Sequence, residues 1–141
     1  MPELSQMGEE FHAERADVLP GVFDADVFAA TWQALLGQGM GVVLVLEHAD
    51  RLIGAIGAVV APDPCDGAQC AQELFWFCRR EARGHGLLLL EALEAEARRL
   101  GVERLSMAHL DGPNAAPLRR LYLRRGYKPV EVHYSKTLVH S

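Results

Sequence analysis

A pair of glycines marks the first place in the chain where chemistry is indicated. They lie in Arg83-Gly84-His85-Gly86, between a predicted strand that ends at Phe77–Cys78 and a predicted helix over Leu87–Leu100. Glycine lets backbone N–H groups approach a ligand without a Cβ in the way. The start of a helix adds unpaired amides and the positive end of a dipole. The junction therefore predicts a site for a pyrophosphate-bearing cofactor.

A carboxylate among aromatic residues precedes the glycines. Alternation along Ala71–Cys78 places Glu73 on the same face as Phe75 and Phe77. Aromatic neighbours would desolvate the carboxylate and raise its pKa towards that of a general base. The sequence also allows a solvated carboxylate at the strand edge or one paired with an arginine. His109, at the end of a predicted strand, is the alternative base.

Tyr122 is the candidate proton donor. A phenol with a pKa of about 10 is protonated at neutral pH, so it can return a proton to a thiolate whose conjugate acid has a pKa of about 8.5. Tyr122 could instead pack beside Leu118 and Leu121 with its hydroxyl at the surface.

The hydrophobic periodicity predicts the elements that position these groups. We expect two N-terminal helices, an antiparallel hairpin, a strand–helix–strand unit, a short helix and a last strand. Their ranges are Glu9–Val18, a helix capped by Asp24 up to Gly37, Gly41–Glu47, Leu52–Ala61, Ala71–Cys78, Leu87–Leu100, Val102–Leu110, Leu118–Arg125 with Pro117 first, and Tyr127–Leu138. A right-handed crossover makes Ala71–Cys78 and Arg104–Leu110 parallel neighbours.

Length and composition limit the classes of protein. A chain of 141 residues, half of them hydrophobic, predicts one domain. No apolar run of about 18 residues and no leader is seen, so we expect a cytoplasmic protein that binds no membrane. The three cysteines have no known metal spacing, and we expect free thiols and no metal.

The net charge of −5 is unevenly distributed. Residues 1–78 carry a net charge of −10 and residues 79–141 a net charge of +5. A cationic half around a glycine loop suits a polyanionic cofactor. The acidic overall balance argues against nucleic acid as a partner.

Two motifs carry a resemblance to a known family. Arg83-Gly84-His85-Gly86-Leu87-Leu88 resembles the Arg/Gln-x-x-Gly-x-Gly/Ala acyl-CoA signature of the GNAT superfamily of acetyltransferases, with Leu88 where Gly or Ala is usual. Arg80 stands where proline is common in that family. Asn114, followed by Leu121–Tyr127, is similar to the family's Asn and Leu-Tyr-x-x-x-Gly-Phe/Tyr element. Glu73-Leu74-Phe75-Trp76 looks similar to a branch of the family found in phage and proteobacterial genomes.

The resemblance implies a single GNAT-like acyl-CoA-binding domain over residues 1–141. Residues 1–40 would flank the acceptor site, and residues 41–138 would form the sheet and cofactor-binding core. The implied α/β (α+β) fold is a mixed, mostly antiparallel sheet with a central parallel strand pair, flanked by helices. A homodimer through the late strands is compatible with this pattern.

The implied reaction is transfer of an acetyl group from acetyl-CoA to a primary amine of a small molecule or protein. Glu73 would be the base and Tyr122 the acid, and backbone amides of Phe77, Cys78 and Arg79 would polarise the thioester carbonyl. The cofactor-binding set adds Asn114 and the six residues of the signature. A non-catalytic acyl-CoA-binding module is the alternative, because Leu88 and Arg80 depart from the family pattern. A nucleotide-binding protein is disfavoured, because no Lys-Ser/Thr follows the glycines.

Overall fold

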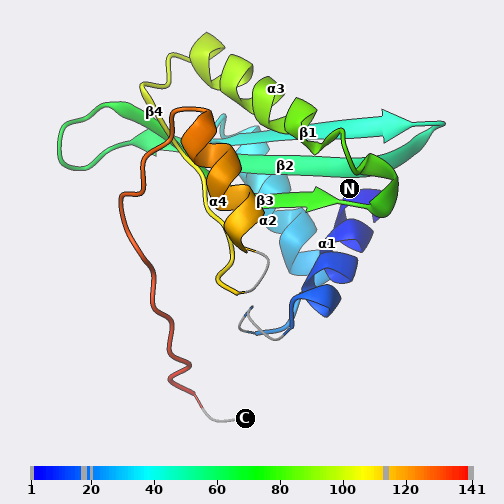
Figure 1. The fold of residues 1–141 in the computed structure, drawn as a ribbon. Helices are drawn as coiled ribbons and strands as arrows, with labels where there is room; N and C mark the ends of the chain where they lie inside the picture. Colours follow the sequence, from blue (N-terminus) through cyan, green and yellow to red (C-terminus); the bar gives the residue numbers. More distant parts are fainter. Residues whose placement is uncertain (1, 17–18, 20, 113–114, 140–141) are drawn as a thin grey trace.

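The sheet is mixed and has helices on both of its faces (Figure 1). The computed structural model describes residues 2–16, 19, 21–112 and 115–139. Within them the strand order is β1-β2-β3-β4, where the strands span Gly41–His48, Arg51–Pro62, Gln69–Cys78 and Arg104–Ser106. The pairs β1–β2 and β2–β3 are antiparallel, and β3–β4 is parallel. The predicted mixed, mostly antiparallel sheet with a parallel pair is thus confirmed, and this pair lies at one end of the strand order.

Helices α1 (Pro2–Glu14) and α2 (Ala25–Gly37) cover one face of the sheet. A first helix was predicted over Glu9–Val18: Glu9–Glu14 are helical, but the predicted start was wrong, because α1 begins seven residues earlier, and Val18 lies outside the described residues. Leu4 and Met7 are almost fully buried against α2 and the strands, and Phe11 continues their stripe with helical spacing. That apolar stripe is short and set among polar residues, and packing against α2 and the strands stabilises the earlier start. Helix α2 begins as predicted, because the Asp24 carboxylate accepts hydrogen bonds from the amides of Asp26 and Val27 at 3.0 Å each.

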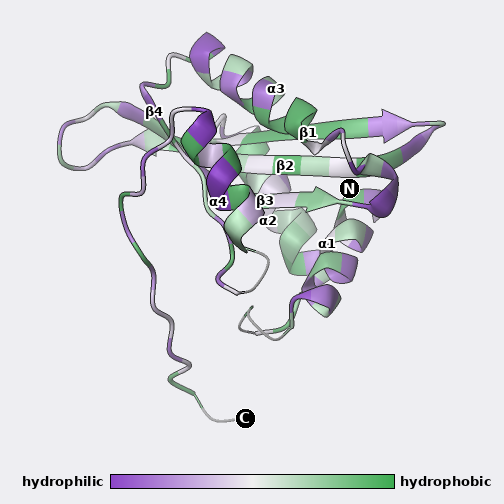
Figure 2. Cartoon of the chain, in the orientation of Figure 1, coloured by the Kyte–Doolittle hydropathy of each residue, from purple (hydrophilic) through white to green (hydrophobic). Residues whose placement is uncertain are grey.

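Helix α3 (Gly86–Arg99) covers the opposite face. Leu89, Leu90 and Leu93 are buried, and they are core residues as expected. The exposed side of the helix carries its charged residues, so hydrophilic and hydrophobic stretches alternate along α3 in Figure 2. A 3-10 helix, η1 (Arg80–Ala82), connects β3 to the glycine loop.

The pairing of β2 with β3 is irregular at Gly57, a glycine inside β2. A β-bulge falls between Gly57 and Ala58, opposite the part of β3 between Glu73 and Phe75. A Cβ at Gly57 would lie 2.0 Å from the Phe75 ring, so only glycine admits this ring against β2. The bulge also interrupts the alternation of β3, so the prediction that Glu73 shares a face with Phe75 and Phe77 was wrong. Glu73 lies opposite Ala58 on the α3 face, and the two phenylalanines pack on the α1 and α2 face.

The C-terminal quarter departs most from the prediction. Strand β4 keeps three of the residues expected over Val102–Leu110, and helix α4 spans Ala115–Arg124, so Pro117 is its third residue and not its first. Within the described residues 127–139 no strand forms. The alternation of Val130, Val132 and Tyr134 suits a sheet, but these side chains are 76–94% exposed and the segment runs away from the strands (Figure 1). Alternation shows that a segment fits a sheet, and it does not show that a partner edge is present.

Candidate active site

A cleft opens where β3 and β4 part. Strand β4 pairs with Cys70–Gln72, and beyond Gln72 the same edge of β3 is left without a strand partner. The cleft has a volume of about 900 Å³. Its walls come from β3, from residues 108–110, from α4, and from the segment that joins α1 to α2. The cleft thus follows the C-terminal half of β3, which carries the predicted base and the predicted backbone amides.

Glu73 is buried in the wall of this cleft, with 7% of its surface exposed. Its Oε1 accepts a hydrogen bond from the Ala108 amide at 3.0 Å. Burial raises the pKa of Glu73 to about 7, and the Ala108 amide opposes this shift in part. The predicted desolvation of the carboxylate is present, so Glu73 changes charge close to neutral pH.

Tyr122 reaches the same residue, Ala108, from α4. Its hydroxyl donates a hydrogen bond to the Ala108 carbonyl oxygen at 2.8 Å, and the side chain is buried. Burial, and secondly the negative charge of Glu73, raise the pKa of Tyr122. The hydroxyl therefore stays protonated through the physiological range. The fold thus brings the candidate base and the candidate acid together at one residue, although they are 49 positions apart in the sequence.

The backbone of β3 offers fewer free amides than the sequence suggested. The Arg79 amide donates to the Ile53 carbonyl of β2 at 2.8 Å, so it is not free to bind a ligand. Consecutive residues of a strand direct their N–H groups to opposite edges, so the Phe77 amide also faces β2 and the Cys78 amide faces the open edge. Of the three predicted amides, Cys78 is the one the geometry leaves for an acyl oxygen.

The side chain of Arg79 has a structural role. It is buried, forms a two-pronged ion pair with Glu10 of α1 at 3.1 and 3.3 Å, and donates to the Leu52 carbonyl at 2.8 Å. These bonds tie α1 to the end of β3. Arg83, by contrast, is exposed beside the glycine loop.

The glycine loop has the geometry of an anion-binding helix start. Gly84 has a φ of +85°, which favours glycine, and Gly86 begins α3. A Cβ at Gly86 would lie 3.3 Å from the Cys78 sulfur, so this residue lets α3 start against the end of β3. His85, at the N-cap, makes no side-chain cap, and no acidic residue lies in the first turn.

The free amides of this loop can be located. The Leu88 amide donates to the His85 carbonyl at 3.0 Å, whereas the amides of Gly86 and Leu87 have no partner within the helix. The side chain of Leu88 is 52% exposed. Asn114, the remaining predicted contact, lies outside the described residues.

One buried donor beside the loop lacks a partner. Among the described side chains, the indole Nε1 of Trp76 is buried and makes no hydrogen bond. Trp76 lines the cleft, and its ring lies 3.9 Å from the position of a Cβ on Gly86. The neighbouring Cys78 thiol is a weak acceptor for it, because the Trp76 side chain opposes in part the rise that burial causes in the pKa of Cys78. A ligand that brings an oxygen acceptor would satisfy this buried donor better. Such a ligand would lie between the open edge of β3 and the start of α3.

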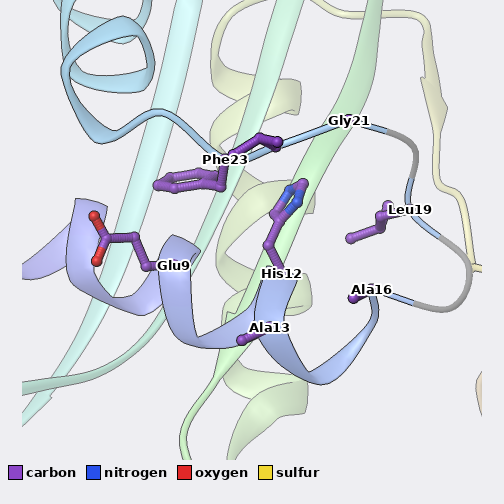
Figure 3. Close-up of a pocket in the computed structure, with 8 residues that line it drawn as sticks. Glu9, His12, Ala13, Ala16, Leu19, Gly21 and Phe23 are labelled. Atoms are coloured by element: carbon purple, nitrogen blue, oxygen red, sulfur yellow. The ribbon is translucent and has the colours of Figure 1, made fainter. Parts of the chain in front are cut away.

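The opposite side of the cleft is an aromatic wall, which the sequence analysis did not predict as a cluster. Phe23 packs with tilted rings against His12 and Phe28 at ring-centroid distances of 5.1 Å, and Phe28 meets Phe75 edge-on at 5.4 Å. Figure 3 shows His12 on α1 and Phe23 on the connecting segment pointing towards one another. The aromatic residues of the two N-terminal helices were visible as helix stripes. Their convergence on one cavity depends on how the helices cross the sheet.

His109 and His133 also line the cleft, and among the described residues neither forms a hydrogen bond with Glu73. His109 is exposed, with its Nδ1 3.3 Å from the Leu110 carbonyl oxygen, and His133 is exposed on the C-terminal segment. Among the described residues no group of three or more His, Cys, Asp or Glu side chains is arranged to hold a metal ion. None of the described helices has both the length and the apolar character needed to cross a membrane.

Comparison with known proteins agrees with this geometry. The model of the acetyltransferase (GNAT) family matches residues 8–127. No curated protein sequence matches the chain significantly.

Solved structures share the fold at low sequence identity. A protein from Pyrococcus furiosus described as an acetyl transferase is 21% identical to this chain and has a TM-score of 0.73. The match covers 97% of this chain and 93% of the Pyrococcus furiosus chain. A predicted acetyltransferase from Clostridium acetobutylicum, solved with acetyl-CoA, has a TM-score of 0.74 at 13% identity, covering 96% and 88%. The ribosomal-protein-alanine N-acetyltransferase of Brucella melitensis has a TM-score of 0.65 at 18% identity, covering 96% and 92%.

Proposed function

Because the chain belongs to the GNAT family of acetyltransferases, we propose that it transfers the acetyl group of acetyl-CoA to a primary amine in the cleft between β3 and β4. The observation that carries this proposal is the convergence of Glu73 and Tyr122 on Ala108, at the open edge of β3. Residues 1–141 would act as one acyl-CoA-binding domain, with residues 1–40 beside the acceptor.

The residues present fit the cofactor. The amides of Gly86 and Leu87 lie at a helix start that no acidic side chain neutralises, which suits a pyrophosphate. The open amide of Cys78 and the unpartnered indole of Trp76 are donors of the kind that the carbonyl oxygens of the acyl arm need. The related Clostridium acetobutylicum structure was solved with acetyl-CoA, which supports the same cofactor here.

Each catalytic role follows from a protonation state. A primary amine is a nucleophile only when neutral, and an alkylamine has a pKa of about 10, so a base must accept a proton. Glu73 is proposed as that base, because its pKa of about 7 leaves it ionised just above neutral pH. The amine nitrogen forms a bond to the acyl carbon, and the carbon–sulfur bond breaks.

Tyr122 is proposed to return the proton to the sulfur. Its one hydroxyl hydrogen is directed at the Ala108 carbonyl, so donation to sulfur requires the hydroxyl to rotate. The Cys78 amide is proposed to donate to the acyl oxygen as negative charge develops there. Overall the bound ammonium loses two protons: Glu73 passes one to solvent before the attack, and the second, lost from the nitrogen after the attack, replaces the proton that Tyr122 gives to the sulfur.

The test is calorimetric titration with acetyl-CoA, followed by an assay of thiol release with a panel of primary amines. We expect saturable binding, and thiol release that depends on the amine. Binding without thiol release from any amine would support the non-catalytic alternative. Absence of binding at millimolar acetyl-CoA would contradict both.

Tyr122→Phe tests the acid. The phenyl ring keeps its place in α4, so we expect an unchanged dissociation constant for acetyl-CoA and a kcat lower by roughly tenfold to a hundredfold, in line with the loss of a general acid. A matched control is Tyr134→Phe, because Tyr134 is 94% exposed and lies outside the cleft lining. An unchanged kcat for Tyr122→Phe would remove Tyr122 from the mechanism.

A further inference from the structure

The acceptor side of the cleft has an apolar wall that reaches solvent. Val22, on the segment between α1 and α2, is 94% exposed, and Val27 on α2 is 61% exposed. Both line the cleft beside the rings of Phe23 and Phe28. Apolar side chains that face solvent around a cavity mark a surface on which an apolar ligand can be buried.

The aromatic rings behind these valines form one continuous set. Phe28 lies between Phe23, Trp32 and Phe75, with ring centroids 5.1 to 6.3 Å apart. These spacings are typical of tilted and edge-to-face ring pairs. A planar ring of a ligand could add to such a set at its outer end, beside Phe23 and His12 (Figure 3).

The charged groups of the cleft select for a cation. Among the lining residues Asp24, Glu73 and Glu131 are acidic, and Arg15 is the single arginine or lysine. The Arg15 guanidinium already contacts the Asp111 carbonyl oxygen at 3.5 Å. Above pH 7, where Glu73 is ionised, an acceptor that carries phosphate or carboxylate groups would therefore meet more negative than positive charge from these four residues. The other titratable residues of the lining are Cys78 and the histidines His12, His109 and His133.

The cleft has too few carboxylates deep inside it to bind an amine with several positive charges. The Asp24 carboxylate is held by two backbone amides at the start of α2, and Glu131 lies on the exposed C-terminal segment. Glu73 is thus the acid that lies deep in the cavity, which suits one ammonium group at the end of an apolar body. Amines with many charges would leave most of them against the aromatic wall.

From these observations we infer that the acceptor is a small arylalkylamine, with its ring against Phe23, Phe28 and Val27 and its amine directed to Glu73. This inference rests on the proposed acetyl transfer and specifies its substrate class. The volume of about 900 Å³ is within the range of cavities that hold a small ligand together with part of a cofactor.

The experiment compares 2-phenylethylamine with three probes in the thiol-release assay at saturating acetyl-CoA. n-Propylamine lacks the ring, spermidine has several charges, and glucosamine 6-phosphate carries an anion. We expect kcat/KM for 2-phenylethylamine to exceed that for n-propylamine by at least about tenfold, the size of a well-buried apolar group. Equal or faster acetylation of any of the three other probes overturns the inference and leaves the proposed acetyl transfer standing.

A variant in the wall tests the location. Val27→Lys places a cation where the ring is expected, so we expect kcat/KM for 2-phenylethylamine to fall by at least about tenfold while the dissociation constant of acetyl-CoA is unchanged. The control is Val45→Lys, a similarly exposed valine on β1 outside the cleft, which should match the parent protein. If Val27→Lys and Val45→Lys lower kcat/KM for 2-phenylethylamine equally, the ring does not bind at Val27 and the inference is overturned.

Two outcomes separate this inference from the proposed function. If acetyl-CoA fails to bind, the acetyl transfer and the inference both fall. If acetyl-CoA binds but no amine is acetylated, calorimetry with 2-phenylethylamine decides, and the absence of binding, or binding unaffected by Val27→Lys, overturns the inference.

Discussion

Glu73 combines two properties that oppose one another. The carboxylate is buried, which costs stability when it is charged, and the proposed reaction needs it in the charged form. The hydrogen bond from the Ala108 amide offsets part of that cost. The raised pKa of Glu73 therefore leads to one prediction for activity and another for stability.

For activity, we expect kcat/KM to rise with pH around pH 7 and to level off above it, because the base must lose its proton. Glu73→Gln keeps an oxygen for the Ala108 amide and removes the base, so turnover should fall by about a hundredfold or more. The variant should also lack the step near neutral pH, measured as kcat/KM from about pH 5.5 to 9. If the step persists in Glu73→Gln, another group, with His109 the first candidate, is the base.

For stability, the sign follows from the raised pKa. The folded protein favours the protonated carboxyl, so this stabilisation is complete below the unfolded-state pKa near 4.5 and is lost as pH rises to about 7. Glu73→Gln stays neutral at every pH. We expect it to exceed the parent protein in free energy of unfolding by roughly 1–3 kcal/mol near pH 8, with little difference near pH 4.5.

Urea unfolding at the two pH values measures this difference. Glu9→Gln is a suitable control, because Glu9 is exposed on α1 and no buried charge is removed. A destabilised Glu73→Gln near pH 8 would show that the charged carboxylate is held by more than the Ala108 amide.

At the scale of elements, the start of α3 is the feature that a single substitution can test. Gly86→Glu adds a carboxylate where a phosphate is expected, next to the Cys78 sulfur, so we expect no detectable acetyl-CoA binding by calorimetry. Ala95→Glu adds the same charge at an exposed position of the same helix and should bind acetyl-CoA like the parent protein. Wild-type affinity in Gly86→Glu would place the phosphates elsewhere.

Elements with strong local signals were predictable from sequence. Helix α2 has its Asp24 cap, α3 has its leucine stripe, and the β1–β2 hairpin has alternating β-branched residues around a short turn. The early start of α1 and the missing strand after Tyr127 were not predictable in the same way. Burial of Leu4 depends on α2 and β2 lying beneath it, and strand formation depends on a free partner edge.

In the candidate site, too, local features were predictable from sequence and features that depend on distant contacts were not. The glycine pattern located the start of α3, because it is a local property. Simple alternation failed for Glu73, because the bulge in β3 that turns it to the face opposite Phe75 and Phe77 depends on the pairing with β2. The two bonds of Ala108 to Glu73 and Tyr122 and the aromatic wall around Phe23 also arise from contacts between distant segments. The bond from the Arg79 amide to Ile53 likewise depends on the register with β2.

At the scale of the whole molecule, the uneven charge of the sequence has a counterpart in the two sides of the cleft. The glycine loop and α4 belong to the half with a net charge of +5, and the aromatic wall of α1 and α2 belongs to the half with a net charge of −10. A polyanionic cofactor and a cationic acceptor would thus each approach the half of opposite charge.

The uneven distribution of charge predicts that the affinity for acetyl-CoA depends on salt concentration. Raising the salt concentration shortens the screening length from about 10 Å at 0.1 M to about 3 Å at 1 M, so the attraction of several phosphates to the cationic half should weaken. We expect the dissociation constant of acetyl-CoA, measured by calorimetry, to rise by about tenfold over this range. The dissociation constant of 2-phenylethylamine should change much less, because it carries one charge and binds mainly through its ring. A salt-independent affinity for acetyl-CoA would mean that fixed backbone amides at Gly86 and Leu87, and not the net charge of residues 79–141, hold the phosphates.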